Sequence, residues 1–193
     1  MRSATEAPSA PSKRLFSVEE YYRMAEAAVL RPDENLELLE GEVFVMERRT
    51  PPHAACTMRL SSLLFAAHAN RLSTIAVHHP VRLDDHSEPE PDVSVLKRRE
   101  DYYRNAHPGP GDALVLVEVS GAGEAYDRDV KVPLYARCGI PEVWLVRLLA
   151  DSIRVYRTPE NGAYRNVSDF GRGQTLSPSL LPEVALSTDD ILG

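Results

Sequence analysis

Two carboxylates stand at the ends of apolar, strand-like segments of the chain. Asp92 follows Pro91 and precedes the apolar residues 93–96, and Glu118 lies near the end of the apolar segment 113–119. An ionised carboxylate in such a segment is costly unless it is paired or bound to a metal. If the two segments pair as antiparallel strands, both carboxylates can bind one cation. Ligand sets made only of oxygen suit Mg²⁺ or Mn²⁺, which need only one or two protein carboxylates.

A lysine follows these carboxylates, on a helix that the sequence predicts over residues 125–138. Asp127 and Lys131 are four residues apart and share one face of that helix. Lys131 can reach back toward the strand end, where it would orient a water or stabilise negative charge on a phosphate. Taken singly, each residue also has an ordinary structural explanation. Asp92 could begin a strand, Glu118 could lie at a frayed strand end, and Asp127 with Lys131 could form a solvated ion pair.

The elements that must position these side chains follow from the hydrophobic pattern and the turn residues. Ser17 and Glu20 form a capping box before a helix over residues 18–29. Gly41 lies in the turn of a hairpin, and Asn161-Gly162 joins two further antiparallel strands. The pattern predicts a helix over 53–70, strands over 74–83, 91–96, 113–119 and 141–148, a partly helical connection over 97–105, and an irregular C-terminal tail.

The helix over 125–138 ends at Gly139 and connects strand 113–119 to strand 141–148. Such a βαβ crossover makes these two strands parallel neighbours. The expected fold class is therefore α/β, with a mixed β-sheet flanked by helices. A chain of 193 residues with 43% hydrophobic and 26% charged residues is ordinary for one globular domain. We expect a disordered tail over residues 1–14 and a single α/β domain over residues 15–193.

Charge and cysteine content restrict the function classes. The net charge of −7 argues against a protein that coats nucleic acid through bulk charge. It does not exclude a nuclease, because a cluster of acidic metal ligands is itself negative until the cation binds. Cys56 and Cys138 are far apart, and the histidines form no HExxH pattern, so a zinc hydrolase is not expected. No signal peptide is evident, and without an apolar run of about 18 residues we expect no membrane span. The two cysteines fit no disulfide framework, so we expect a protein of the reducing cytoplasm.

Five segments, in their order and spacing, resemble the PD-(D/E)XK nuclease superfamily and, more specifically, the Uma2 family of endonucleases. They are LELLEGEV, PPH, EPEPDVSVL, LVLVEVS and DRDVKVPLYARCGIPEVWLV, within residues 16–157. The resemblance implies a restriction-endonuclease-like core with Asp92 and Glu118 as metal ligands and Lys131 as the catalytic lysine. The usual motif has lysine two residues after the acid, where this chain has Ser120. In Uma2-like proteins the lysine lies on the following helix, and Lys131 matches that position.

The same resemblance includes two further residues in the candidate site. Glu37 and His53 stand where the family pattern has an acid and a histidine. Glu37 would complete the metal site or form a salt bridge with Lys131, although an outward-facing strand residue fits the sequence equally. His53 follows Pro51-Pro52 at a helix start, where a structural role is an equal alternative.

The leading hypothesis is an Mg²⁺- or Mn²⁺-dependent endonuclease that hydrolyses DNA and acts as a homodimer. The first alternative is a binding or scaffold protein that has the nuclease fold without its activity. A hydrolase of another phosphate ester is a minor alternative, because no GxxxxGK[ST] or GxGxxG loop is present. Phosphate contacts could come from Arg48, Arg49 and residues 97–99, while the tyrosines show no pattern of a platform for base stacking.

Overall fold

The structure is a computed structural model that describes residues 12–67 and 73–193. Most of the predicted tail over residues 1–14 and the end of the predicted helix over 53–70 lie outside these residues. Helix α1 (Val18–Glu26) begins at the expected capping box. The Glu20 N–H donates to Ser17 Oγ at 3.2 Å, and the Ser17 N–H donates to Glu20 Oε2 at 3.1 Å. Such a cap stabilises a helix by about 1 kcal/mol.

The other elements follow α1 along the chain. They are β1 (Leu36–Leu39), β2 (Glu42–Val45), α2 (Pro51–Ala67), β3 (Ser73–Val77), β4 (Val93–Lys97), β5 (Ala113–Ser120), α3 (Glu124–Tyr126), α4 (Val132–Arg137), β6 (Glu142–Arg147), β7 (Ser152–Glu160), β8 (Ala163–Gly171), β9 (Thr175–Leu176), β10 (Leu186–Ser187) and α5 (Thr188–Leu192). No helix of the described residues is both long and apolar enough to cross a membrane.

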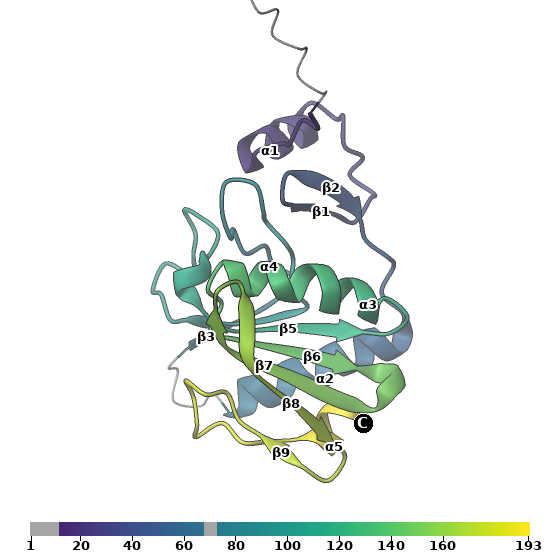
Figure 1. Cartoon of the computed structure of the whole chain (residues 1–193), viewed down its shortest axis with the longest axis vertical. Coiled ribbons are helices and arrows are strands. Elements are labelled where there is room, and N and C mark those ends of the chain that lie inside the picture. Colours follow the sequence, from purple (N-terminus) through teal and green to yellow (C-terminus); the bar gives the residue numbers. More distant parts are fainter. Residues whose placement is uncertain (1–11, 68–72) are drawn as a thin grey trace, which may run out of the picture.

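A six-stranded sheet in the order β3-β4-β5-β6-β7-β8 forms the centre of the molecule (Figure 1). Only β5 and β6 are parallel within it, and the other neighbouring strands are antiparallel. The βαβ crossover therefore forms as predicted, and so does the β7–β8 hairpin, which turns at Asn161 and Gly162 with positive φ angles of 52° and 79°. The prediction of a mixed α/β fold is confirmed.

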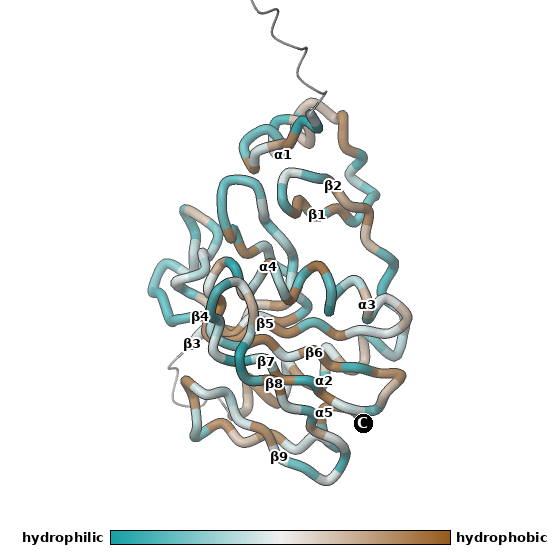
Figure 2. Tube along the Cα trace, in the orientation of Figure 1, coloured by the Kyte–Doolittle hydropathy of each residue, from teal (hydrophilic) through white to brown (hydrophobic). Residues whose placement is uncertain are grey.

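The alternation of side chains along β5 decides which residues face which helix. Val117 and Val119 point into a core with α2 and the C-terminal segment, while Leu116 points into a second core with α4. Because the side-chain period of a strand is two, Glu118 shares the α4 face with Leu116. Hydrophobic stretches run through the central strands (Figure 2), and Leu116, Val117 and Val119 beside Glu118 are all buried, so Glu118 is a carboxylate in a largely apolar strand.

The helix between β5 and β6 is not the single regular helix that the sequence predicts. Its first turn, α3, continues into a π-helical turn over Asp127–Lys131 and then into α4. Pro133 has no N–H and would clash with the carbonyl four residues earlier in a regular helix. The wider turn avoids this conflict through a hydrogen bond from the Val132 N–H to the Asp127 carbonyl.

Three other segments differ from the prediction. The strand predicted over 74–83 ends at Val77, because His78 takes a left-handed conformation with φ 52°. Residues 98–105 form turns and a loop rather than a partial helix. The C-terminal segment, predicted to be irregular, contains β9, β10 and the short helix α5, for which Ser187 supplies the N-cap.

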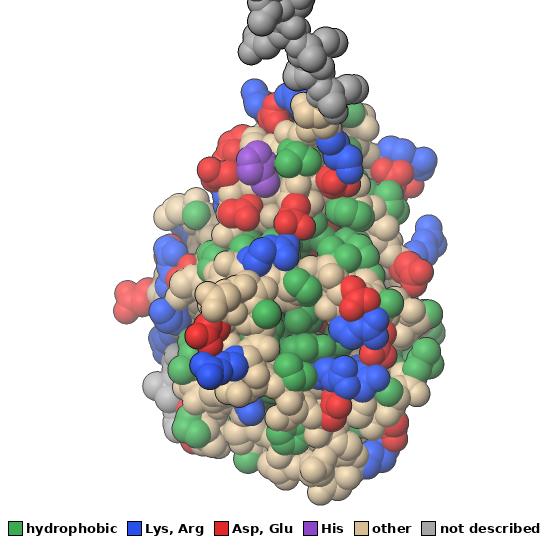
Figure 3. Space-filling view, viewed as in Figure 1, with side chains coloured by type: hydrophobic (Ala, Val, Ile, Leu, Met, Phe, Trp, Pro, Cys, Tyr) green, Lys and Arg blue, Asp and Glu red, His purple; other side chains and the backbone are tan. Residues whose placement is uncertain are grey.

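The β1–β2 hairpin and α1 lie together above α4 in Figure 1, away from the centre of the six-stranded sheet. Gly41, with φ 79°, forms the hairpin turn, and a Cβ atom there would lie 2.5 Å from the Leu15 Cβ. The Glu88 N–H donates to the Leu38 carbonyl at 2.7 Å and joins the hairpin to the loop before β4. Side chains of both charges are interspersed on the face shown in Figure 3.

Candidate active site

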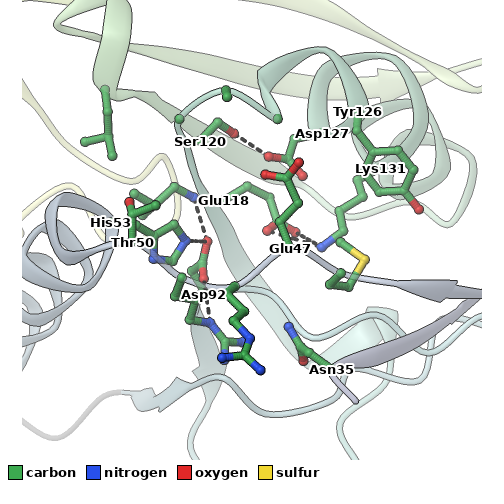
Figure 4. A pocket seen from close by; sticks show the side chains of 18 of the residues that line it. Asn35, Glu47, Thr50, His53, Asp92, Glu118, Ser120, Tyr126, Asp127 and Lys131 are labelled. Atoms are coloured by element: carbon green, nitrogen blue, oxygen red, sulfur yellow. Dashed lines mark hydrogen bonds and ion pairs between the residues drawn. The ribbon is translucent and has the colours of Figure 1, made fainter. Parts of the chain in front are cut away.

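The pairing of β4 with β5 brings the two predicted metal ligands together. Val93 lies opposite Val117 in this antiparallel pair, so Asp92 and Glu118 follow at the next position of the register. The Val119 N–H donates to Asp92 Oδ2 at 2.8 Å. Both carboxylates line one cleft of about 760 Å³ between the hairpin, α2 and the π-helical turn (Figure 4). The sequence prediction that these two residues meet is therefore correct.

Asp92 is surrounded by donors from three segments, which we call the aspartate cluster: Asp92, His53, His78 and Arg49. His53 Nε2 lies 3.1 Å from Asp92 Oδ2, and His78 Nε2 lies 3.2 Å from Oδ1. Arg49 Nε lies 3.8 Å from the same Oδ1. Burial alone would raise the pKa of Asp92, but the two histidines and the Val119 N–H outweigh it and hold that pKa well below its usual value.

Lys131 is the centre of a second group, the lysine cluster: Lys131, Glu37, Glu118, Asp127 and Tyr135. Its Nζ donates to Glu37 Oε1 at 3.0 Å and lies 3.4 Å from both oxygens of Glu118. The Tyr135 hydroxyl donates to Glu118 Oε1 at 2.5 Å. Side-chain exposure is only 2% for Lys131, 4% for Glu37 and 3% for Glu118. Lys131 therefore reaches back to the strand end, as predicted. Glu37 forms a salt bridge with Lys131, which is one of the alternatives that the sequence allowed.

The lysine cluster carries a surplus of acid. Burial raises the pKa of Glu37, Glu118 and Asp127, and the charge of Lys131 opposes this rise at each of them. Burial would lower the pKa of Lys131, but the three carboxylates raise it above its usual value. One ammonium thus faces three carboxylates in surroundings that disfavour uncompensated charge.

Asp127 is held at the cleft by the strand end. The Ser120 hydroxyl, which stands where the usual nuclease motif has lysine, donates to Asp127 Oδ2. The π-helical turn carries Asp127 at its first residue and Lys131 at its last, and both line the cleft. Ser120 therefore positions the segment that brings the lysine to the site.

The donor set fits a hard divalent cation. The surplus carboxylates would be neutralised by such an ion, because the single charge of Lys131 is shared by both oxygens of Glu37 and both oxygens of Glu118. In the part of the chain that the structure describes, no three His, Cys, Asp or Glu side chains converge as a preformed metal cluster. A cation bound by one or two carboxylates and several waters, as Mg²⁺ prefers, is compatible with this arrangement.

Two members of these clusters were missed by the sequence analysis. His78 was assigned to a strand, although the antiparallel register that pairs Val77 with Val93 leads directly to His78 beside Asp92. Tyr135 lies four residues after Lys131, and this spacing is the signal that could have placed it in the site. His53 contacts Asp92 rather than occupying an isolated helix end.

Comparisons with known proteins identify the family of the chain. Residues 18–189 match the family model Uma2, described as "Putative restriction endonuclease". A solved structure, of a "putative nuclease belonging to DUF820" from Anabaena variabilis ATCC 29413, superposes with a TM-score of 0.71 at 17% identity, covering 92% of this chain and 97% of that one. No curated protein matches the chain. Because the family model spans most of its length, the chain belongs to the Uma2 family.

Proposed function

We propose that this protein is an endonuclease that hydrolyses DNA phosphodiester bonds with the help of Mg²⁺ or Mn²⁺. The observation that carries the proposal is the 3.4 Å approach of Lys131 to Glu118, the carboxylate that lies beside Asp92. The lysine comes from a helix rather than from the strand, yet it reaches the acid pair as the catalytic lysine of a nuclease does. The family description, a restriction endonuclease, supports DNA as the substrate.

Asp92 and Glu118 would hold the cation. When bound, the ion supplies a Lewis acid that lowers the pKa of the attacking water and neutralises charge on the phosphoryl group. The cleft needs such an ion to admit a phosphate, because its lining is predominantly acidic. Its charged residues are the acids Glu37, Glu47, Glu90, Asp92, Glu118 and Asp127 and the bases Arg48, Arg49 and Lys131.

The protein's own residues have distinct roles in this mechanism. Lys131 is a fixed positive charge rather than a base, since its pKa is raised, and it stabilises negative charge that develops on the phosphoryl oxygens. Glu37 holds the ammonium in place through the 3.0 Å contact. His53 orients the Asp92 carboxylate at 3.1 Å. Arg48 and Arg49, exposed beside the cleft, are placed to hold the phosphate backbone.

A scaffold function is the second candidate, and one observation favours it. Asp92 and Glu118 already have protein partners, since His53, His78 and Val119 contact the first and Lys131 and Tyr135 contact the second. Titration with Mn²⁺, followed by electron paramagnetic resonance, separates the two functions. The nuclease binds Mn²⁺ in the native form and loses that binding in Asp92→Asn, whereas a scaffold leaves the Mn²⁺ signal free in both.

Cleavage of supercoiled plasmid tests the activity directly. The native chain should nick plasmid with Mg²⁺ or Mn²⁺ and not with EDTA. Asp92→Asn and Lys131→Ala should each lose more than roughly 100-fold in rate, with circular dichroism used to select folded protein. The matched control is Asp190→Asn, which makes the same chemical change at an exposed site on α5 and should cleave normally. Metal-dependent cleavage that persists in Asp92→Asn contradicts the proposal.

We further infer a homodimer, because two copies related by a two-fold axis would present one cleft to each strand of a duplex. Analytical ultracentrifugation of the native chain tests this inference. A sedimentation coefficient that stays monomeric at all accessible concentrations contradicts it. A cytoplasmic location remains part of the proposal, and fractionation of cells expressing the tagged chain tests it.

A further inference from the structure

The turn after β4 contains two consecutive tyrosines in a strained backbone conformation. Tyr102 has φ 50° and Tyr103 has φ 59°. The left-handed region is unfavourable for a residue with a bulky side chain, and such strain is concentrated at functional sites. The surrounding contacts must therefore hold this turn in place.

Tyr103 provides those contacts. Its hydroxyl donates to the Lys97 carbonyl at 2.6 Å, and the Arg99 guanidinium lies over its ring, 4.7 Å from the centroid. The same guanidinium donates to both oxygens of Asp101, at 2.9 and 2.7 Å. The turn is thereby closed on its inner side by one tyrosine and one bidentate ion pair.

Tyr102 is left projecting from this closed turn, with 74% of its surface exposed. A large aromatic ring on a fixed backbone loses little conformational freedom when a flat ligand stacks on it. The sequence alone predicts no platform for base stacking, because two adjacent tyrosines do not show which one is anchored. The structure separates them into an anchor and an exposed ring.

The residues around Tyr102 are predominantly basic. Residues 97–104 contain four bases and two acids, and because Arg99 is paired with Asp101 the positive charge comes from Lys97, Arg98 and Arg104 against Glu100, in a chain whose net charge is −7. Lys and Arg side chains gather along the left edge of the molecule in Figure 3, over the loops that follow β4. This surface is a local exception to the acidic character of the protein.

The turn is distinct from the cleft. Asp92 precedes the first residue of β4 and Lys97 is its last, so the two ends lie roughly 16 Å apart at about 3.3 Å per residue. Nothing in the proposed cleavage chemistry uses Tyr102 or its basic neighbours.

We propose that this turn is an accessory binding site for single-stranded nucleic acid. Tyr102 stacks on one base, and the basic side chains beside it contact the phosphates on either side. Stacking on an exposed aromatic ring combined with phosphate contacts is how proteins hold single strands without reading their sequence. In a duplex the faces of the bases are covered by neighbouring base pairs, so no base is available to stack on the exposed Tyr102 ring.

Fluorescence anisotropy tests this proposal. Native protein in EDTA is titrated against a labelled single-stranded DNA 12-mer, and separately against an abasic strand of the same length. Tyr102→Ala should weaken binding to the base-bearing strand about tenfold, while Tyr102→Phe retains native affinity. On the abasic strand, the native protein and Tyr102→Ala should bind equally.

Leu180→Ala is the control, because Leu180 is another apolar side chain, 54% exposed, outside this turn; its affinity should be unchanged. Equal binding of native protein and Tyr102→Ala to the base-bearing strand overturns the proposal. So does an equal loss on the abasic strand, which would indicate a change in the turn rather than lost stacking. Because EDTA prevents cleavage, failure of the plasmid assay leaves this test unaffected.

Discussion

The backbone N–H of Val119 donates a 2.8 Å hydrogen bond to Asp92 Oδ2, and Val119 is the residue that follows Glu118. The backbone of β5 thus holds Asp92 in place, and the side chain of Glu118 on the same strand supplies the second candidate metal ligand. The spacing of the two carboxylates is set by strand register rather than by flexible side chains. A pair fixed in this way requires no loop to close before a cation binds.

Lys131→Met should destabilise the protein strongly. It removes the only ammonium among Glu37, Glu118 and Asp127 in the lysine cluster, and breaking a buried ion pair costs about 3–5 kcal/mol. Urea unfolding measures the change in free energy. The double variant Lys131→Met with Glu118→Gln should cost less than the sum of the two single variants. Strict additivity would show that the pair is not coupled.

Surface ion pairs provide the comparison for that experiment. Arg172 pairs with Asp151 at 2.8 Å, and both side chains are about half exposed. Arg172→Met should cost no more than about 1 kcal/mol, because solvent screens the exposed pair.

Tyr135→Phe should cost more than Tyr164→Phe. Both changes remove a buried or half-buried hydroxyl, but Tyr135 donates to the Glu118 carboxylate at 2.5 Å and Tyr164 donates to the Ile140 carbonyl at 2.8 Å. A hydrogen bond to a charged group contributes about 1.5–3 kcal/mol, against about 0.5–1.5 kcal/mol for a neutral one. Urea midpoints of the two variants measure the difference, which should grow as rising pH removes the proton that burial keeps on Glu118; costs that stay equal from pH 5 to 8 would contradict this prediction.

Stability should fall as pH rises, through the contribution of Glu118. Burial raises its folded-state pKa well above the usual value, so the folded state keeps its proton after the unfolded state has lost it. The loss of stability begins near the unfolded pKa of about 4.3 and continues up to the raised folded pKa. Glu118→Gln removes this dependence of the unfolding free energy on pH. The stability of the variant relative to the native protein should therefore increase as the pH rises. Urea unfolding in EDTA from pH 5 to 8 checks this, and parallel profiles would contradict it.

Gly41→Ala should destabilise the protein more than Gly173→Ala. Both glycines have positive φ, 79° and 77°, so both variants carry the cost of the left-handed backbone, about 1–2 kcal/mol. Only at Gly41 would the new Cβ meet another atom, the Leu15 Cβ at 2.5 Å; none lies within 4 Å at Gly173. Thermal unfolding of the two variants isolates the contact between the hairpin and the segment before α1. Equal shifts in Tm would show that Leu15 can move away from the new Cβ atom at little energetic cost.

Much of the fold is local enough to be predicted. The capping box at Ser17, the turn at Asn161-Gly162 and the crossover to β6 each depend on neighbouring residues, and each forms as expected. The wrong boundaries come from tertiary effects. His78 leaves the strand direction and contacts Asp92, and Pro133 widens the helical turn beside the cleft.

Part of the candidate site could be predicted from the sequence. The proximity of Asp92, Glu118 and Lys131 follows from their order along the chain, two strands and then a helix. His53 was included through the family resemblance, but His78 could not be placed, because only the folded sheet brings the end of β3 to the carboxylate that His53 also contacts. Tyr102 shows the same limit. Tyr102 is exposed because the adjacent Tyr103, rather than Tyr102 itself, donates the hydrogen bond to the Lys97 carbonyl, and the sequence does not show which of the two does so.

Glu37 has a consequence for any shortened form of the protein. It belongs to β1, a strand of the two-stranded hairpin that contributes nothing to the six-stranded sheet. A chain trimmed before residue 50 would keep every strand of that sheet but would lose one wall of the cleft and one of the carboxylates on Lys131. Leu38 and Leu39 of the same strand are buried, and Leu39 belongs to the core beneath α4, so the trimmed chain would lose apolar packing together with this part of the cleft.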